Sequence, residues 1–161
     1  MPLLNFISRP VKSIMGTITV PGDKSISHRS IILGSIAQGT TIVDGFLDGE
    51  DCMATIKAFK AMGVNIEGPT NQRVIIHGVG KYGLKVPMGV IDCGNSGTSM
   101  RLLAGLLSAQ SFDSELSGDD SLLTRPMLRV SKPLSLMGAD ISTHEGKPPL
   151  IIKGGALLHS I

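Results

Sequence analysis

Apolar residues recur in two stretches of this chain with the spacing of core-facing helices. In residues 98–109 they fall at positions i, i+1, i+4 and i+5, which places them along one side of a helix. Residues 25–37 contain a comparable set of apolar positions. The apolar positions are Ile32, Leu33 and Ile36 in the first stretch and Leu102, Leu103, Leu106 and Leu107 in the second. The pattern predicts two helices that each bury one face.

These two helices belong to a longer segment that occurs twice. Residues 19–78 resemble residues 91–154, with an offset that grows from 72 to 76 along the alignment, so short insertions separate the copies. A repeat of this length is typical of a duplicated supersecondary unit, not of a short-repeat solenoid. The matched positions are Arg29 with Arg101, Ala37 with Ala109, Met62-Gly63 with Met137-Gly138, and Ile75-Ile76 with Ile151-Ile152.

Each copy has the same order of predicted elements, which is a βαβαββ unit. Gly63 and Gly138 follow predicted helices at the usual position of a C-cap glycine, and Pro126 suits the first turn of a helix. The fold class is therefore α/β (α+β). The predicted elements are strand 17–20, helix 25–37, strand 40–44, helix 51–62 and strands 64–67 and 73–77 in the first copy, and strand 90–92, helix 98–109, strand 112–116, helix 126–137 and strands 139–143 and 149–153 in the second.

Composition narrows the class of protein. Of the 161 residues, 42% are hydrophobic and 17% are charged, which is typical of a globular domain and not of a disordered chain. The net charge is only +2 and aromatic residues make up 3%, so we expect no nucleic-acid partner. No apolar run approaches the roughly 20 residues of a membrane-spanning helix. We therefore expect a cytoplasmic protein with no membrane partner.

Cysteine and histidine are too sparse for a metal site. Cys52 and Cys93 have neither CxxC spacing nor a neighbouring histidine, so we expect two reduced thiols. A reactive Cys93, beside a Gly-rich turn, is the alternative. The histidines are scattered and none has the partners of a nucleophilic triad. They are His28, His77, His144 and His159. The sequence predicts no metal and no cofactor.

The start of the first long helix has the residues of an anion site. The segment PGDKSISHR, residues 21–29, follows a predicted strand and opens a helix. A helix N-terminus presents free N–H groups and about half a positive charge, which favours phosphate or carboxylate. Ser25 adds a hydroxyl, Lys24 an ammonium and Arg29 a guanidinium one turn further on. The alternative is an ordinary serine cap with solvated cations.

The second copy has a similar helix start in DCGNSGTSMR, residues 92–101. Its glycines, Gly97 among them, allow a ligand to approach the backbone closely, while Asn95 and Thr98 offer neutral hydrogen bonds. Arg101 repeats the position of Arg29. A structural Gly-rich turn is the alternative, but the occurrence of such a helix start at matched positions of both copies favours a site.

Two further groups of charges were considered for the site. Arg125 precedes Pro126, which restricts it to an extended backbone at the mouth of the fourth helix, and the alternative is a solvated surface arginine. The carboxylates are better explained as acidic first turns of helices than as catalytic groups. They are Asp48, Glu50, Asp51, Asp119 and Asp120.

Three segments together resemble the 5-enolpyruvylshikimate-3-phosphate synthase family. PGDKSISHR resembles the family's P-G-[SD]-K-S-x-[ST]-x-R, GNSGTSMR (94–101) resembles its G-N-[SA]-G-T-[ST]-x-R, and LTRPM (123–127) resembles its x-x-R-P-[MI]. The segments occur in the same order with similar spacing, and the resemblance runs from about residue 10 to 155. The family transfers the enolpyruvyl group of phosphoenolpyruvate to the 5-hydroxyl of shikimate 3-phosphate, on the route to chorismate and the aromatic amino acids.

The resemblance implies roles for individual residues. Lys24, Ser25 and Arg29 would bind shikimate 3-phosphate, and Lys24 would also contact phosphoenolpyruvate as a catalytic residue. The phosphoenolpyruvate pocket would be completed by Asn95, Gly97 and Arg125, with Thr98 and Arg101 as further candidates. Gly97 is a glycine here, as in family members that are sensitive to glyphosate. No cofactor is implied.

The resemblance also implies a domain organisation. The family has two domains, each of three βαβαββ units packed around buried helices, with the site between them. We expect two of the three units of one domain here, and an inactive chain when it is isolated. A full-length member is expected to be monomeric, whereas this chain is expected to self-associate. The expected segments are 1–15 (part of the other domain in the family), 16–80 (first unit), 81–89 (connector), 90–155 (second unit) and 156–161 (start of a third unit).

Two other functions are alternatives to this assignment. The related enolpyruvyl transferase acting on UDP-N-acetylglucosamine would have Lys-Asn in place of Lys24-Ser25 and a reactive loop cysteine. A different class is a non-catalytic βαβαββ module that binds a phosphorylated metabolite or RNA. Salt-dependent RNA affinity would favour that module.

Overall fold

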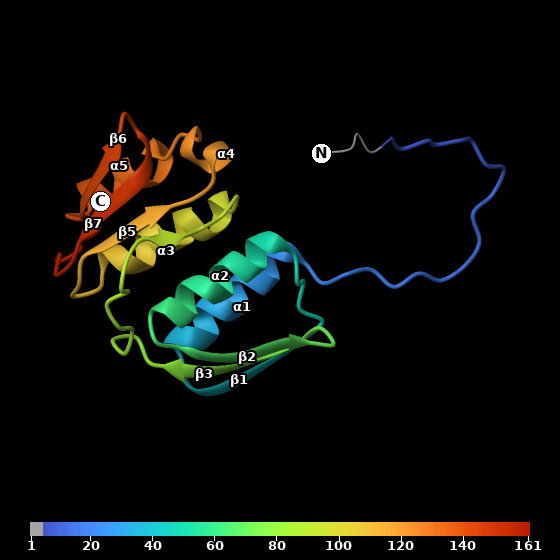
Figure 1. Cartoon of the computed structure of the whole chain (residues 1–161), viewed down its shortest axis with the longest axis horizontal. Coiled ribbons are helices and arrows are strands. Elements are labelled where there is room, and N and C mark those ends of the chain that lie inside the picture. Colours follow the sequence, from blue (N-terminus) through green and yellow to red (C-terminus); the bar gives the residue numbers. More distant parts are fainter. Residues whose placement is uncertain (1–4) are drawn as a thin grey trace.

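The first unit is a three-stranded antiparallel sheet covered on one face by two helices. The computed structural model describes residues 5–161. Its first sheet has the order β1-β3-β2, and Figure 1 shows both helices on the same side of it. The central strand β3 pairs with β1 from Gln38↔Val79 to Asp44↔Arg73. The elements are α1 (Lys24–Ile36), β1 (Gln38–Asp44), α2 (Glu50–Ala61), β2 (Asn65–Thr70) and β3 (Arg73–Val79).

The second unit repeats this plan with a four-stranded mixed sheet. Its order is β4-β5-β7-β6, with β4 parallel to β5 and the other pairs antiparallel. The elements are β4 (Ile91–Asp92), α3 (Gly97–Ser108), β5 (Ser114–Ser117), α4 (Asp120–Leu123), α5 (Leu128–Leu136), β6 (Asp140–His144) and β7 (Lys147–Lys153). The two units confirm the α/β class and the duplication that the repeat predicts.

Helices α1, α2 and α3 lie between the two sheets, where one apolar core joins the units (Figure 1). The fully buried side chains come from both copies, with Phe59 of α2 and Leu103 of α3 among them. With few aromatic residues, the core is built mainly from Ile, Leu, Val and Met, as the composition requires. Because α2 contacts both α1 and α3, it connects the two helix starts that the sequence predicts as anion sites.

Glycine ends the long helices where the sequence predicts it. Gly63 has φ +85° and Gly138 has φ +102°, and each directly follows the C-cap residue of a helix. This left-handed backbone is strained for residues with a Cβ, so glycine is favoured at both positions. The pair confirms the predicted helix ends in both copies.

One predicted strand and one predicted helix start are wrong. Residues 17–20 form no strand with any described residue, because they extend away from the first sheet and have no strand to pair with (Figure 1). The first unit therefore lacks the opening strand that β4 provides in the second. The fourth helix begins at Leu128, not at Pro126, and a separate one-turn helix, α4, precedes it.

The segments at the two ends of the chain contribute little to these sheets. Residues 5–20 are exposed and contain no helix or strand, while residues 1–4 of the expected segment 1–15 lie outside the described part of the chain. Residues 156–161 also form no regular element, although the amide of His159 donates to the carbonyl of Met137 at 2.9 Å. No helix within residues 5–161 is long and apolar enough to cross a membrane.

The predicted apolar stripes are only partly covered. Leu103 and Leu107 are fully buried, whereas Leu33 is 60% exposed and Leu102 is 42% exposed. Ile26, in the first turn of α1, is also largely exposed. The structure thus confirms an exposed apolar part of α1 and α3, and self-association through it stays a prediction.

Candidate active site

The start of α1 carries the first group of predicted site residues. Asp23 is the N-cap, and its carboxylate accepts the amide of Ile26 at 2.7 Å, so the cap is not Ser25. Ser25 and Arg29 are exposed, and Lys24 begins the helix with its side chain 52% exposed. Two cations and a free hydroxyl therefore face solvent here, although Asp23 already uses part of the helix's positive end.

The start of α3 carries the second group, and its arginines converge on a glycine. Ser96 is the N-cap and accepts the amide of Ser99 at 3.1 Å. Gly97 is buried beneath two guanidinium groups: a Cβ at this position would lie 2.7 Å from Nη1 of Arg101 and 3.3 Å from Nη1 of Arg125. Two arginines that are distant in sequence thus meet over one backbone position, an arrangement that suits a doubly charged anion.

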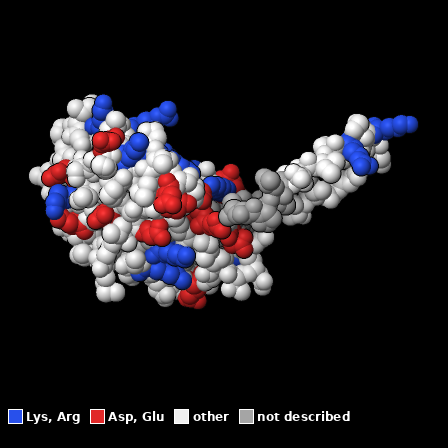
Figure 2. Space-filling model, turned by 45° about the horizontal axis from the view of Figure 1, so that its top comes forward, with Lys and Arg blue, Asp and Glu red and all other residues white. Residues whose placement is uncertain are grey.

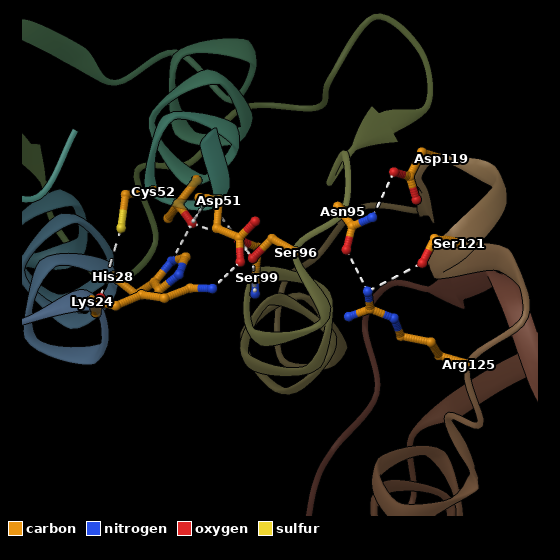
Figure 3. A network of polar contacts seen from close by, with 11 residues as sticks. Lys24, His28, Asp51, Cys52, Asn95, Ser96, Ser99, Asp119, Ser121 and Arg125 are labelled. Atoms are coloured by element: carbon orange, nitrogen blue, oxygen red, sulfur yellow. Dashed lines mark hydrogen bonds and ion pairs between the residues drawn. The ribbon is translucent and has the colours of Figure 1, made fainter. Parts of the chain in front are cut away.

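Asn95 fixes the position of Arg125. Its Oδ1 accepts from Nη2 of Arg125, which also donates to Oγ of Ser121 at 3.3 Å. The Nδ2 of Asn95 donates to Oδ2 of Asp119 at 2.8 Å (Figure 3). The pKa of Asp119 is lowered by the backbone amide of Leu122 and then by Asn95, so Asp119 is a stable anion at neutral pH. Arg125 is therefore held at the site and is not a freely solvated surface arginine.

Helix α2 links these two groups. The first turn of α2 contains Asp51, as the acidic-turn interpretation predicts, but its carboxylate also forms an ion pair with Lys24. The backbone carbonyl oxygen of Asp51 lies 3.4 Å from Oγ of Ser99. Figure 3 shows Lys24 and Asp51 on one side of the α3 start and Asn95 and Arg125 on the other. The structure therefore brings Lys24 of the first group, through Asp51, close to the α3 start.

No role for His28 was predicted from the sequence, yet its side chain lies between the start of α1 and Thr55 of α2. The side chain is 0% exposed, and its Nδ1 is 2.8 Å from Oγ1 of Thr55. Burial lowers the pKa of His28. The charge of Lys24 lowers this pKa further, whereas the charge of Asp51 raises it. The available signal was its spacing of three residues before the buried Ile31, which indicates an inward-facing position. Sequence distance alone hid its partners, because Thr55 lies 27 residues away.

The two thiols are buried and are weaker acids than a free cysteine. Burial raises the pKa of Cys93 to about 12, with a smaller effect from Asp92, so the alternative of a reactive Cys93 is wrong. Burial also raises the pKa of Cys52, which lies under the first turn of α1. Both cysteines are free, as the sequence predicts. Within the described part of the chain, no cluster of three or more His, Cys, Asp or Glu side chains could hold a metal.

Two hollows flank the helix starts. One, of about 220 Å³, includes Lys24, Asp51 and Cys52. The other, of about 400 Å³, reaches Asn95, and its lining includes four acidic residues from the two units. The larger hollow of about 490 Å³ at the β2–β3 hairpin contains none of the predicted site residues. Neither of the two flanking hollows is lined by residues of both groups.

Comparison with known proteins places this geometry in a family. The sequence model described as EPSP synthase (3-phosphoshikimate 1-carboxyvinyltransferase) matches residues 8–160. A 3-phosphoshikimate 1-carboxyvinyltransferase of Legionella pneumophila (strain Philadelphia 1) is 73% identical over 159 residues, which are 99% of this chain and 37% of that protein. The protein of the same name from Methylococcus capsulatus is 60% identical over 97% of this chain and 36% of its own length.

Solved structures agree with this placement. The 2.37 Å structure of EPSP synthase from Acinetobacter baumannii matches with a TM-score of 0.87 and 61% identity. The match covers 91% of this chain and 33% of that one. The chain therefore spans about a third of the length of the relatives it matches.

Proposed function

Because the chain belongs to the EPSP synthase family, we propose that it carries part of the active site of a 3-phosphoshikimate 1-carboxyvinyltransferase. The reaction transfers the enolpyruvyl group of phosphoenolpyruvate to the 5-hydroxyl of shikimate 3-phosphate and releases phosphate. It requires protonation of the phosphoenolpyruvate methylene and attack at C2 by the hydroxyl, which gives up its proton to a base. Loss of phosphate together with a proton of the new methyl group then restores the double bond. The reaction serves aromatic amino acid biosynthesis, in the cytoplasm.

The observation that carries this proposal is the pair of cation-bearing helix starts on either side of Asp51. We assign shikimate 3-phosphate to Lys24, Ser25 and Arg29, which are exposed at the start of α1. We assign phosphoenolpyruvate to the α3 start, where the arginines converge on Gly97, and to Lys24. Its remaining proposed ligands are Asn95 and Arg125, with Thr98 and Arg101 as further candidates.

Charge balance supports a site that needs further groups. Each substrate carries a carboxylate and a phosphate, so the two bring roughly five to six negative charges. In this chain Asp51 is paired with Lys24, and Asp23 caps the same helix as Arg29. These carboxylates offset much of the local positive charge, so the remaining cations and the acid and base must come from other parts of an EPSP synthase. We propose that the 161-residue chain alone does not turn over.

A phosphate-release assay tests that proposal directly. Purified chain is incubated with both substrates, and a full-length EPSP synthase serves as the positive control. General acid–base groups alone typically contribute about 10²–10⁴-fold to a rate, so release should stay at background without them. Clear turnover that requires both substrates would contradict the proposal.

Binding of shikimate 3-phosphate can be tested separately. Titration followed by NMR should shift the amides of residues 24–29, and Arg29→Ala should weaken the effect because a charge-assisted contact is lost. Lys153→Ala is the control, because Lys153 also carries a positive charge but pairs with Asp113 in the sheet of the second unit. Equal shifts with shikimate, which lacks the phosphate, would show that the α1 start does not read the phosphate.

The remaining candidates are weaker. On the face drawn in Figure 2, Lys and Arg are interspersed with Asp and Glu, with no large basic area of the kind that binds RNA backbones. This favours small anionic substrates over an RNA-binding module. We propose that the partly exposed stripes of α1 and α3 make the isolated chain self-associate, which sedimentation at several concentrations tests. A strictly monomeric chain at high concentration would contradict it.

A further inference from the structure

We propose that His28 is a positioning residue, which holds the two anion-binding helix starts at a fixed separation through a buried chain of hydroxyl groups. The inference rests on the proposed function, because these helix starts are the ones assigned to the two substrates. His28 is fully buried, so it acts on the site through its neighbours and not by contact with a ligand.

The chain of hydrogen bonds runs from α1 through α2 to α3. Nδ1 of His28 is 2.8 Å from Oγ1 of Thr55, which is 2.7 Å from Oγ of Ser99. Ser99 then donates to Oγ of Ser96 at 2.7 Å, and Ser96 is the N-cap of α3 (Figure 3). All four side chains are essentially inaccessible to solvent: His28 0%, Thr55 0%, Ser99 0% and Ser96 0%. One line of short contacts thus joins three helices.

The donor and acceptor roles along this series of hydrogen bonds assign the tautomer of His28. A hydroxyl has one hydrogen, and Ser99 uses its hydrogen on Ser96. Thr55 must then donate to Ser99, so Thr55 accepts from His28 and the proton of the neutral ring lies on Nδ1. This leaves Nε2 as a buried acceptor with no hydrogen-bond partner among residues 5–161. A buried nitrogen without a partner is costly, so we infer that the bond from Nδ1 to Thr55 compensates by holding the helices in position.

The hydrogen bonds from His28 to Ser96 fix the relative orientation of the helices, which the apolar core alone cannot do. Hydrophobic contacts are non-directional and allow helices to shift while remaining packed, whereas a buried hydroxyl without its partner is costly. The contacts therefore select one relative placement of α1, α2 and α3. The carbonyl oxygen of Asp51 lies next to the same hydroxyl groups, 3.5 Å from Oγ1 of Thr55 and 3.4 Å from Oγ of Ser99. Because Asp51 pairs with Lys24, the placement extends to the side chain shared by both proposed substrates.

Neutrality of the ring is consistent with this role. The ionisable groups that act on His28 are Lys24 on its own helix and Asp51 on α2, and they have opposite effects. Burial is the largest effect and lowers the pKa of His28, so the neutral ring is maintained near neutral pH. A neutral ring with its proton on Nδ1 supplies the single donor that Thr55 requires in this series of hydrogen bonds.

Three substitutions separate positioning from simple packing. His28→Ala removes the donor, and Thr55→Val removes the central hydroxyl while keeping a side chain of similar shape. His28→Asn is the conservative variant, because its amide nitrogen can reach the position of Nδ1 and donate to Thr55. Ser35→Ala is the matched control, because Ser35 lies in the same helix, is equally buried, and has an Oγ without a hydrogen-bond partner in the described chain.

The first readout needs no ligand. In the ¹⁵N spectrum of the unmodified chain, Nδ1 of His28 should resonate as the protonated ring nitrogen and Nε2 as the unprotonated one. Amide resonances of residues 96–99 on α3 should move in His28→Ala and Thr55→Val, stay in place in Ser35→Ala, and return toward their original positions in His28→Asn. A proton on Nε2, or unmoved α3 amides in folded His28→Ala, would overturn the proposal. The tautomer measurement decides the matter even if the alanine variant does not fold.

The second readout uses phosphoenolpyruvate as the probe. Its dissociation constant should rise at least about threefold in His28→Ala and Thr55→Val, and stay near that of the unmodified chain in His28→Asn and Ser35→Ala. Equal weakening in Ser35→Ala would show a packing effect and overturn the proposal. If the unmodified chain binds no phosphoenolpyruvate, the proposed substrate assignment fails, and the tautomer and amide shifts still decide the role of His28.

Discussion

A methyl group at Gly97 should separate stability from anion binding at the α3 start. Gly97→Ala places a Cβ 2.7 Å from Nη1 of Arg101 and 3.3 Å from Nη1 of Arg125, so at least the first guanidinium must move. Both contacts are with the ends of flexible side chains, so the backbone can stay in place. We therefore expect little loss of stability and a clear loss of affinity for phosphoenolpyruvate.

The magnitude follows from the contact that a displaced Arg101 would lose with phosphoenolpyruvate. A hydrogen bond to a charged group contributes about 1.5–3 kcal/mol. Arg101 is partly exposed, so the lower end applies and the loss should be about 1.5 kcal/mol, or about tenfold in the dissociation constant. Stability should change by less than about 0.5 kcal/mol, because a gain in helix propensity offsets part of the crowding.

Gly105→Ala is the control on the same helix. A Cβ at Gly105 meets no atom within 4 Å, so the variant should gain about 0.5–1 kcal/mol of stability and bind phosphoenolpyruvate unchanged. Urea unfolding gives the stabilities, and calorimetric titration gives the affinities. If Gly97→Ala binds as tightly as the unmodified chain, the convergence of the two arginines does not determine affinity and the assigned pocket is wrong.

Three further outcomes test the core, the buried histidine and the thiols. Leu103→Ala should cost about 2–5 kcal/mol in urea unfolding because Leu103 is fully buried, whereas Leu102→Ala on the exposed side should cost far less; similar losses would contradict the helix orientation. Burial lowers the pKa of His28 in the folded chain, against an opposing effect of Asp51, so the free energy of unfolding should fall as pH drops below about 6.5, the pKa of an unfolded histidine. His28→Asn should reduce this dependence of stability on pH, and an equal dependence in both proteins would refute the linkage. Cys93 should resist alkylation near pH 8 until the chain unfolds, since its pKa is raised to about 12, and rapid labelling of the native protein would show that it is accessible.

Local patterns in the sequence were sufficient for the repeated elements. The apolar stripe of residues 98–109 predicts α3 because side chains three and four apart share one face of a helix. Gly63 and Gly138 mark helix ends because their left-handed backbone disfavours other residues. The strand predicted at 17–20 failed for the opposite reason: a strand exists only where a partner supplies hydrogen bonds, and none of the described residues lies beside it.

The candidate site shows the same division. The sequence by itself determined which segments combine cations with a helix start, because Lys24 and Arg29, and likewise Gly97 and Arg101, lie within about one turn of each other at the start of a predicted helix. Anion binding at these segments stays a prediction. Only the tertiary structure decided how the two helix starts meet. It places Arg125 over Gly97. It also joins His28 to the α3 start through Thr55 of α2, which lies 27 residues further along the sequence. Such contacts depend on how the units pack around one core, and no local periodicity records that packing.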